Sequence, residues 1–551
     1  MITPKVRRVR KYNDKCHYIG PRHGTIRRHT ILFQRYTTYD AGNTAERKNG
    51  KMEKKRRNRR LAAALVIVML AGNLASCGER SEVESGTDTT GNTSNQTTET
   101  VAETTEAEAR LAISDDLPEN DFGGRDFIVI TCDNANIQKY IAVEELNGEG
   151  VNDAVYSRNL TVADRFNANV TCNFVQTYDA CGSVVEKAIT AGDEDSFHLI
   201  QYHVVANSGN AMKGLYLNWY DVPHIHFEKP WWSDSNVDDL TLNGRCYLAM
   251  GDFALTAVAS TYCVFYDKDR MRDFPDIEDL YTVASEGRWT LDYQRKIAEI
   301  AYMDTNGDGV VNDGDYYGFY SDAQSNVNTY LWSCDNQIFT KDAEGTLQFT
   351  YYSEHLLDVY EKCYALLNET IGAGYKSDHD SGIDKFAQYG TLTANGQIRH
   401  AVTKLAEYDN EYGIIPYPKY DEAQKDYKTM VDGGHEAMAI GKQMTALDFI
   451  GTMTEVLCAE SYKQVLPAYY DVCLKQRYAS SPEDAEMIDL CVASRVFDFG
   501  YVYDNWKGVS FIFQGLLGSK KHQDITSEYQ KKEKAATKHY NDVIDLFYAE
   551  E

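Results

Sequence analysis

Long hydrophobic runs are scarce in this sequence, and the clearest one, Leu61–Ala71, is too short to cross a membrane. It has about half of the roughly 20 apolar residues that a membrane-spanning helix needs. The basic segment Lys54–Arg60 precedes it, and small residues lead from it to Leu74-Ala75-Ser76-Cys77. A basic start, a short apolar middle and a small-residue exit are typical of a secretory signal peptide.

Leu-Ala-Ser-Cys has the pattern of a bacterial lipobox, in which the signal is cut before the cysteine. We therefore predict a lipoprotein signal peptide at 52–76 and diacylglycerol on Cys77. The lipid would anchor the protein at the extracellular face of the bacterial cell membrane. The alternatives are an ordinary signal peptide, or a buried apolar helix with a chance cysteine.

Residues 1–51 show no apolar periodicity and carry paired arginines at Arg7-Arg8 and Arg27-Arg28. One interpretation is a basic arm that binds nucleic acid. A signal peptide, however, normally begins at the initiator methionine, and Met52 stands at that place. We therefore expect 1–51 to be an upstream extension that does not belong to the exported protein.

Positive charge is scarce beyond the signal segment. Residues 1–76 hold 19 Lys and Arg against 4 Asp and Glu, so 37 basic and 79 acidic residues remain from Cys77 onward, a net charge of −42. A surface this acidic repels nucleic acid and anionic lipid. From Gly78 to about Asp116 large apolar residues are almost absent too, and such a composition cannot bury enough surface to fold. We expect a disordered Thr/Glu/Ser-rich tether at 77–119 and a folded body at 120–551.

Familiar catalytic motifs are missing from the body. His435-Glu436 begins a zincin-like string, but Ala439 stands where the second histidine is needed. Gly515–Lys520 is too short for a phosphate-binding loop, and no Gly-x-Ser-x-Gly elbow occurs. The two carboxylates that cleave a glycoside can be distant in sequence, so the sequence leaves the presence of such a pair open.

Closely spaced cysteine pairs are missing as well. None of the ten cysteines after Cys77 lies in a Cys-x-x-Cys spacing, which argues against a zinc ribbon or a redox pair. Several of them lie inside apolar patterns, such as Cys263 and Cys363. We predict that these are buried free thiols.

Short apolar runs alternate with helical patterns along the body. Strands are predicted at 126–132, 197–201, 245–250 and 261–266. The helices are predicted at 151–166, 290–303 and 354–367. This interleaving indicates α/β layers with parallel sheets, while the pattern after 444 is mainly helical. The body exceeds the usual size of one hydrophobic core, so two lobes are expected.

One loop has the spacing of a calcium-binding loop, with oxygen-bearing side chains at positions 1, 3, 5, 9 and 12, glycine at 6 and a backbone carbonyl at 7. Gly309 provides the sharp turn. Asp315 replaces the usual final glutamate, which predicts a weaker hold on the ion. The alternative is a polar loop without an ion. The predicted Ca²⁺ ligands are Asp304, Asn306, Asp308, the Val310 carbonyl, Asn312 and Asp315.

Aromatic residues are abundant, with 40 Tyr, 20 Phe and 6 Trp. A sugar has apolar C–H faces and hydroxyl edges, so a cleft of aromatic plates with Asp, Asn and Gln side chains would suit it. Any single ring is more often a core residue. Trp231 and Trp232 are adjacent in a proline-bounded loop, however, and we do not expect both to be core residues.

Several blocks resemble the extracellular solute-binding proteins of carbohydrate ABC transporters, of the family 1 type. They are VNDAVYSRN (151–159), PWW (230–232), TYCVFYDKD (261–269), RWTLDYQRKIAEIA (288–301), the calcium-type loop with YYGFY (316–320), GIIPYPKYDEAQKDY (413–427), PAYYDVCLKQRY (467–478) and AEMIDL (485–490).

The resemblance implies an α/β fold of the periplasmic-binding-protein type II class, in which hinge strands join two lobes that close around a solute. It implies crossovers near 262–269 and 430–441. Lobe one would comprise about 120–262 plus 432–470, lobe two about 263–431, and the C-terminal helices 471–551.

By the same resemblance, a monomeric body captures a sugar or oligosaccharide and delivers it to ABC permease subunits, without catalysis. A surface glycan-degrading hydrolase and a ligand-free structural lipoprotein are the alternatives. The resemblance implies stacking on the solute by Trp231, Trp232 and Trp332, and polar contacts from Asp252, Asp335, Asn336, Gly434 and His435.

Overall fold

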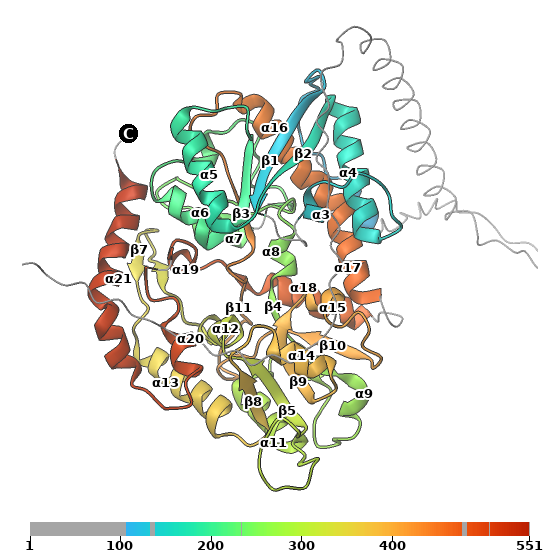
Figure 1. Ribbon diagram of the computed structural model, residues 1–551, viewed down its shortest axis with the longest axis vertical. Coiled ribbons are helices and arrows are strands. Elements are labelled where there is room, and N and C mark those ends of the chain that lie inside the picture. Colours follow the sequence, from blue (N-terminus) through green and yellow to red (C-terminus); the bar gives the residue numbers. More distant parts are fainter. Residues whose placement is uncertain (1–105, 133–137, 233, 476–481, 506, 550–551) are drawn as a thin grey trace, which may run out of the picture. The chain divides into compact units, whose positions relative to one another are not determined.

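The computed structural model describes residues 106–132, 138–232, 234–475, 482–505 and 507–549 (Figure 1). All of the described residues belong to one compact unit, Ala102–Glu551. The upstream extension, the signal peptide, the lipidation site Cys77 and the tether up to residue 105 lie outside the described residues. They stay predictions.

The last part of the predicted tether is ordered. Helix α2 spans Glu106–Leu111. The Asp115 carboxylate lies 2.5 Å from the Arg165 guanidinium, and Leu117 packs into the core. The boundary predicted at 119 is therefore wrong for 106–119, because these residues find partners at the end of α4 (Gly150–Phe166) that their composition does not reveal.

Lobe one is built on a four-stranded sheet in the order β12–β3–β1–β2. β1 (Arg125–Cys132) pairs parallel with β2 (Ala168–Val175) and β3 (Leu199–His203), and β12 (Glu436–Ala439) runs antiparallel to β3. The continuous apolar run in β1 fits a strand that is covered on both faces. The helices along this part of the chain are α3 (Gln138–Ile141), α4, α5 (Tyr178–Ala191), α6 (Val204–Ala211), η1 (Trp219–Asp221), α7 (Asp234–Leu240), α8 (Thr256–Ala259) and, after β12, α16 (Leu447–Glu460).

Lobe two is built on a five-stranded sheet in the order β10–β4–β9–β5–β8. β5 (Tyr317–Asp322) pairs parallel with β8 (Ala373–Lys376) and β9 (Thr391–Gln397). β4 (Tyr262–Asp267) runs antiparallel to β9 and to β10 (Tyr412–Ile415). The other elements are α9 (Lys268–Met271), α10 (Leu280–Ser285), α11 (Leu291–Ala301), α12 (Ser325–Ser333), β6 (Phe339–Lys341), β7 (Leu347–Phe349), α13 (Glu354–Tyr364), η2 (Ala365–Glu369), α14 (Ser381–Ala387), α15 (His400–Thr403) and β11 (Thr429–Met430).

The two sheets share one plan. The orders β2–β1–β3–β12 and β8–β5–β9–β4 both place three parallel strands beside one antiparallel strand. In each sheet this antiparallel strand enters from the other lobe, because β4 follows the segment that leaves lobe one and β12 follows the return. Two α/β lobes with two crossing strands confirm the predicted periplasmic-binding-protein type II fold.

The two crossings lie side by side. Thr261 and Val431 form an antiparallel bridge, and Thr429 Oγ1 donates a hydrogen bond to the Tyr262 carbonyl at 2.9 Å. We call Ser260–Tyr262 and Val431–His435 together the hinge.

The C-terminal region is mainly helical, as its pattern predicts. Helix α21 contacts both lobes (Figure 1). Its Phe547 carbonyl accepts a hydrogen bond from Asn243 at 3.0 Å in lobe one, and its Tyr540 hydroxyl donates to the Leu347 carbonyl at 2.6 Å in lobe two. The elements are η3 (Ser461–Val465), α17 (Leu466–Lys475), α18 (Pro482–Ala493), β13 (Arg495–Val496), α19 (Phe499–Val502), α20 (Ile512–Leu517) and α21 (Ile525–Tyr548).

The structure departs from one predicted strand, at 245–250, and agrees with the predicted burial of the cysteines. The segment 245–250 joins the lobe-one sheet only through a bridge from Ala249 to Met438, because the chain has just turned back on itself between Leu242 and Arg245. None of the cysteines whose side chains the structure describes is in a disulfide, and all but the half-buried Cys172 are buried, as predicted for Cys263 and Cys363.

Candidate functional site

The carboxyl edges of both sheets meet at the hinge. Because β12 is antiparallel to β3, it begins opposite His203, the last residue of β3. In the same way, β4 begins opposite Gln397, the last residue of β9. Ligands of open α/β sheets bind outside the carboxyl ends of the parallel strands. The topology therefore makes the hinge the candidate ligand site.

Asp432 is at the centre of the hinge. Its Oδ2 accepts a hydrogen bond from the Tyr262 hydroxyl at 2.6 Å, and its Oδ1 accepts the Gly434 N–H at 2.9 Å. Burial by itself would raise the pKa of this carboxyl, but those two hydrogen bonds and the charge of Arg399 hold its pKa below the ordinary value. Asp432 is thus a carboxylate at neutral pH, with lone pairs left for a ligand.

Two polar atoms near Asp432 have no hydrogen-bond partner among the described residues. They are Nε of Arg399, which follows β9, and Nε2 of His435, whose side chain is 1% exposed. The His435 Nδ1 lies 2.6 Å from the Asp432 carbonyl oxygen, so we assign the proton to Nδ1 and an acceptor lone pair to Nε2. Burial lowers the pKa of His435 to about 4, which keeps the ring neutral. A donor, an acceptor and a carboxylate are therefore grouped at the hinge.

Asp322, at the end of β5, brings a second carboxyl to the same edge of lobe two. Its Oδ1 accepts the Gln324 N–H at 2.9 Å, and its Oδ2 accepts from Asn326 Nδ2. Burial raises the pKa of Asp322 to about 6, and its charge acts on Tyr262 at the hinge. The Asn326 side-chain oxygen accepts the Tyr417 hydroxyl at 2.9 Å, which fixes the amide.

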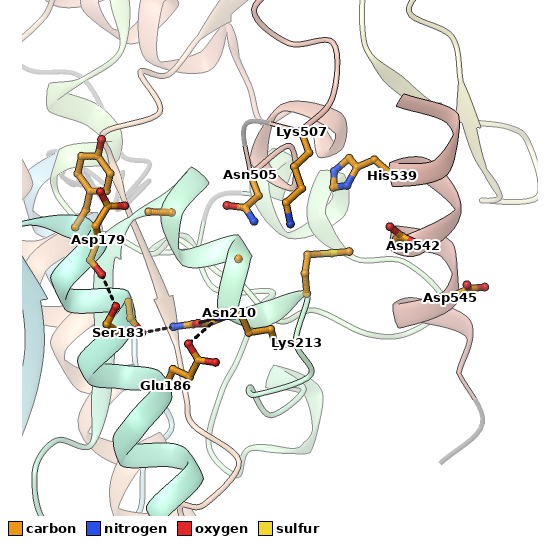
Figure 2. A pocket seen from close by; sticks show the side chains of 15 residues that line it. Asp179, Ser183, Glu186, Asn210, Lys213, Asn505, Lys507, His539, Asp542 and Asp545 are labelled. Carbon is orange, nitrogen blue, oxygen red and sulfur yellow. Dashed lines mark hydrogen bonds and ion pairs between the residues drawn. The ribbon is translucent and has the colours of Figure 1, made fainter. Parts of the chain in front are cut away.

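A cavity of about 510 Å³ lies between α5 and α6 on one side and α21 on the other (Figure 2). Tyr178 lines this cavity, and its ring centroid lies 4.7 Å from that of His203 at the end of β3. Lys213 is paired with Glu186 at 2.8 Å across the cavity wall. Tyr178 thus connects the cavity wall with the end of β3, and the volume of the cavity is in the range of small-molecule sites.

The structure places Trp231 and Trp232 in the core, 0% and 1% exposed. Their indole N–H groups donate to the two carboxylate oxygens of Glu455, at 2.8 and 2.9 Å. The prediction that the two rings would not both be core residues is therefore wrong. The physical reason is Glu455 on α16, which accepts a hydrogen bond from each indole N–H group and so lets both rings be buried.

Trp332 is also buried, 1% exposed, with its indole donating to Asp498 at 2.8 Å. Its ring packs on Tyr501, whose hydroxyl accepts the Gly433 N–H at 3.1 Å. Trp332 therefore lies behind the hinge and supports it through Tyr501, an arrangement that does not match the predicted stacking on a solute.

The other predicted contacts are spread over the molecule. Asp335 is exposed and ion-paired with Lys428. Asn336 is buried and donates to the Cys334 carbonyl at 3.2 Å. Asp252 donates its N–H to the Trp231 carbonyl at 2.9 Å, and burial raises the pKa of its carboxyl to about 7.

Of the predicted set, the structure brings Gly434 and His435 together at the hinge. Sequence reasoning missed their neighbour Asp432, together with Arg399 and Asp322 in lobe two. The signal that could have found them is a polar residue at the carboxyl end of a strand that is otherwise buried. The calcium-type loop lies at the opposite end of β5, between α11 and β5.

No protein-family model and no curated protein matches the chain. Solved structures with a similar fold include UspC of M. tuberculosis, with a TM-score of 0.48 and 13% identity, covering 75% of this chain and 100% of that one. UgpB of Mycobacterium tuberculosis in complex with glycerophosphocholine has a TM-score of 0.47 and 16% identity, over 77% and 99%. A family 1 extracellular solute-binding protein of Bifidobacterium longum subsp. infantis has a TM-score of 0.45 and 10% identity, over 76% and 99%.

The fold assignment rests on the strand order of the two sheets and on the paired crossings. The chain has the periplasmic-binding-protein type II fold. In such a fold the hinge is shared by both lobes, so residues there can sense a molecule that contacts either one. Among the described residues, no helix is both long and apolar enough to cross a membrane.

Proposed function

We propose that the protein captures a polyhydroxylated solute, a sugar or an oligosaccharide, between its lobes and delivers it to the permease of an ABC transporter. The observation that carries this proposal is the hinge. Asp432, Arg399 Nε and His435 Nε2 stand at the carboxyl edges of the sheets with hydrogen-bonding capacity left over. Buried polar atoms normally have partners, so atoms without one at this position favour a ligand that supplies them.

Sugar hydroxyls suit this set because each can donate one hydrogen bond and accept others. A hydroxyl that donates to the Asp432 carboxylate can also accept from the Arg399 guanidinium. A neighbouring hydroxyl can donate to His435 Nε2. The Asp432–Arg399 pair could also neutralise the ammonium and carboxylate groups of an amino acid or peptide, so these are the competing ligands that a solute screen must include.

Solute binding would be coupled to closure of the two lobes. A two-lobed protein exists in open and closed populations, and a ligand favours closure when it contacts both lobes. Lobe two would contribute Arg399 and Asp322, and the return crossing would contribute Asp432 and His435. The bridge between Thr261 and Val431 keeps the crossings in register while the lobes move.

A lipid on Cys77 would hold the body at the extracellular face of the cell membrane, close to its permease. The charge of −42 from Cys77 onward favours neutral ligands and argues against nucleic acid as a partner. We expect the body to act as a monomer. Phase partitioning in detergent tests the anchor: the wild-type protein should enter the detergent phase and Cys77→Ala should stay in the aqueous phase.

A thermal-shift screen tests the solute. The purified protein is heated with monosaccharides, oligosaccharides, amino acids and short peptides, and each sugar is recovered and analysed by chromatography. We expect the melting temperature to rise with at least one sugar that is recovered intact. Cleavage of the sugar would indicate a glycan-degrading hydrolase instead. A lack of response to every sugar would contradict the proposal and leave a structural lipoprotein.

A further inference from the structure

The loop Asp304–Asp315 is not part of the hinge and has its own local order. It joins the end of α11 to the start of β5, at the amino edge of the lobe-two sheet. Gly307 and Gly309 have φ of 72° and 70°, a left-handed backbone that glycine adopts without steric cost. These two turns bring residues 304–310 into one tight coil.

The side chains of this coil are held by its own backbone. The two carboxylate oxygens of Asp304 accept the N–H groups of Gly307 and Gly309 at 2.7 and 2.8 Å. The Asp308 Oδ1 accepts the Val310 N–H at 2.7 Å. The carboxylates are therefore fixed in position, each with further lone pairs available.

One amide group lies among several of the oxygens that the calcium-loop spacing assigns to an ion. Nδ2 of Asn312 donates to the Asp308 Oδ2 at 3.0 Å and to the Val310 carbonyl at 2.7 Å. The Asn312 Oδ1 accepts from Asn306 Nδ2 at 3.2 Å. The side chains or carbonyls at loop positions 3, 5, 7 and 9 thus face one another. The oxygens of Asp308 and Val310, at positions 5 and 7, converge on the amide NH₂ group of Asn312, which carries a partial positive charge.

Asp315, at position 12, supplies an independent observation. Its side chain is 2% exposed. Its Oδ2 accepts the Asn312 N–H and the Tyr302 hydroxyl, both at 2.9 Å, which turns the carboxyl toward the loop. Its Oδ1 is buried and has no hydrogen-bond partner among the described residues. A buried carboxylate oxygen without a partner is unfavourable, and a cation would satisfy it.

We propose that this loop binds one Ca²⁺ ion. Among the described residues, no group of three or more His, Cys, Asp or Glu side chains is placed to hold a metal ion. The carboxylates of Asp304, Asp308 and Asp315 do not form such a group in the structure, so the ion would have to draw them together. The proposed ligand set adds neutral oxygens to these three carboxylates, from the side chains of Asn306 and Asn312 and the carbonyl of Val310. An all-oxygen set of this size suits Ca²⁺ better than Mg²⁺, which keeps several waters.

The affinity should be modest. The Oδ2 of Asp315 is already engaged by two donors, so only Oδ1 is left for the ion, where a final glutamate would supply two oxygens. We expect a dissociation constant of roughly 10⁻⁴–10⁻³ M, the range of extracellular calcium modules. Calcium at that concentration is available outside a cell, which agrees with the side of the membrane that the signal peptide predicts.

The ion would fasten three elements of lobe two. Tyr302 follows α11, and the Tyr317 hydroxyl at the start of β5 donates to the Asn312 carbonyl at 3.0 Å. Lys385 on α14 donates to the Asp313 carbonyl at 2.7 Å. Because β5 also carries Asp322 at its other end, calcium would steady the strand that presents the lobe-two carboxyl.

Terbium luminescence tests the site without any solute. Tb³⁺ replaces Ca²⁺ at oxygen sites, and Tyr302 and Tyr317 are close enough to the loop to sensitise its emission. We expect emission from the purified protein that Ca²⁺ displaces and that Mg²⁺ at the same concentration displaces poorly. The melting temperature should rise by several degrees with Ca²⁺.

Two variants of the same loop decide the ligand set. Asp308→Asn should abolish both the displaceable emission and the calcium-dependent rise in melting temperature. Asp313→Asn is the matched control, because the Asp313 carboxylate pairs with Lys376 at 2.7 Å and is not at a ligand position. It should retain both signals. Melting of each variant in EDTA verifies its fold. Equal calcium shifts in wild type and Asp308→Asn, or no shift in wild type, would overturn the proposal.

Discussion

The Tyr262 hydroxyl donates a hydrogen bond to the Asp432 carboxylate at 2.6 Å, and this bond joins the two segments through which the chain passes between its lobes. Tyr262 begins the first strand of lobe two, and Asp432 precedes the return strand of lobe one. A ligand that hydrogen-bonds Asp432 therefore acts on both crossings at once.

Asp432→Asn should weaken solute binding by about 10- to 100-fold, because a hydrogen bond to a charged group is worth about 1.5–3 kcal/mol. The amide keeps the shape of the side chain but loses the charge and one acceptor. Titration calorimetry with the sugar that gives the largest thermal shift measures the loss.

Asp335→Asn is the comparison for this variant. The sequence also predicted Asp335 as a solute contact, but the structure shows it exposed and paired with Lys428. We expect its affinity to stay within about twofold of wild type, since exposed ion pairs contribute little. If Asp335→Asn loses affinity and Asp432→Asn keeps it, the hinge is not the solute site.

Arg399→Gln should lower solute affinity about tenfold and lower the unfolding free energy only slightly, through the lost attraction between the Arg399 charge and the Asp432 carboxylate. The reason is that Arg399 Nε has no hydrogen-bond partner in the described residues, so its loss breaks no hydrogen bond from that atom. Arg295→Gln, which removes an exposed arginine paired with Glu299, controls for the change in net charge. A large drop in stability for Arg399→Gln with unchanged affinity would assign Arg399 to the fold instead.

The sequence predicts the fold better than the site, and particular residues explain why. The apolar runs at 126–132 and 261–266 become β1 and β4 because a strand covered on both faces needs continuous apolar side chains, which is a local signal. The site depends on distant pairings. Trp231 and Trp232 look available in sequence, and only the approach of Glu455, more than two hundred residues later, explains their burial.

The same limit applies to the hinge. Nothing near Asp432 in the sequence indicates that Tyr262 will donate to it or that Arg399 will lie close by. Loops whose partners are local fare better. The calcium-type loop has the backbone turns expected from its spacing, because its hydrogen bonds join residues only a few positions apart.

Trp231→Ala should destabilise the protein by about 3–5 kcal/mol, the usual cost of removing a buried aromatic ring. It also leaves one oxygen of buried Glu455 without its indole donor. Urea unfolding measures the effect, and Tyr220→Ala, at a tyrosine that is 49% exposed, is the mild control. Folded Trp231→Ala should bind the solute normally. Retained stability with lost binding would instead assign the ring to the solute.

A buried glutamate next to the hinge should make stability depend on pH. The Glu436 carboxyl is 0% exposed and accepts hydrogen bonds from Thr131 and Thr256, each at 3.1 Å, and from Gln201 at 3.2 Å. Burial raises its pKa from 4.5 to about 8. Between these two values the folded protein keeps a proton that the unfolded chain has released, so stability falls as the pH rises through this window.

Glu436→Gln removes that titration while preserving the shape of the side chain. Its unfolding free energy relative to wild type should therefore increase with pH, by about 1–3 kcal/mol between pH 5 and pH 8. Urea unfolding at several pH values measures the difference, and Glu354→Gln, an exposed glutamate on α13, controls for the loss of one negative charge. Glu436 lies opposite His203 in the β12–β3 ladder, at the carboxyl edge of the lobe-one sheet. Its protonation therefore also changes the charge next to the hinge. A constant difference between variant and wild type across this range would show that Glu436 does not hold a proton in the folded protein.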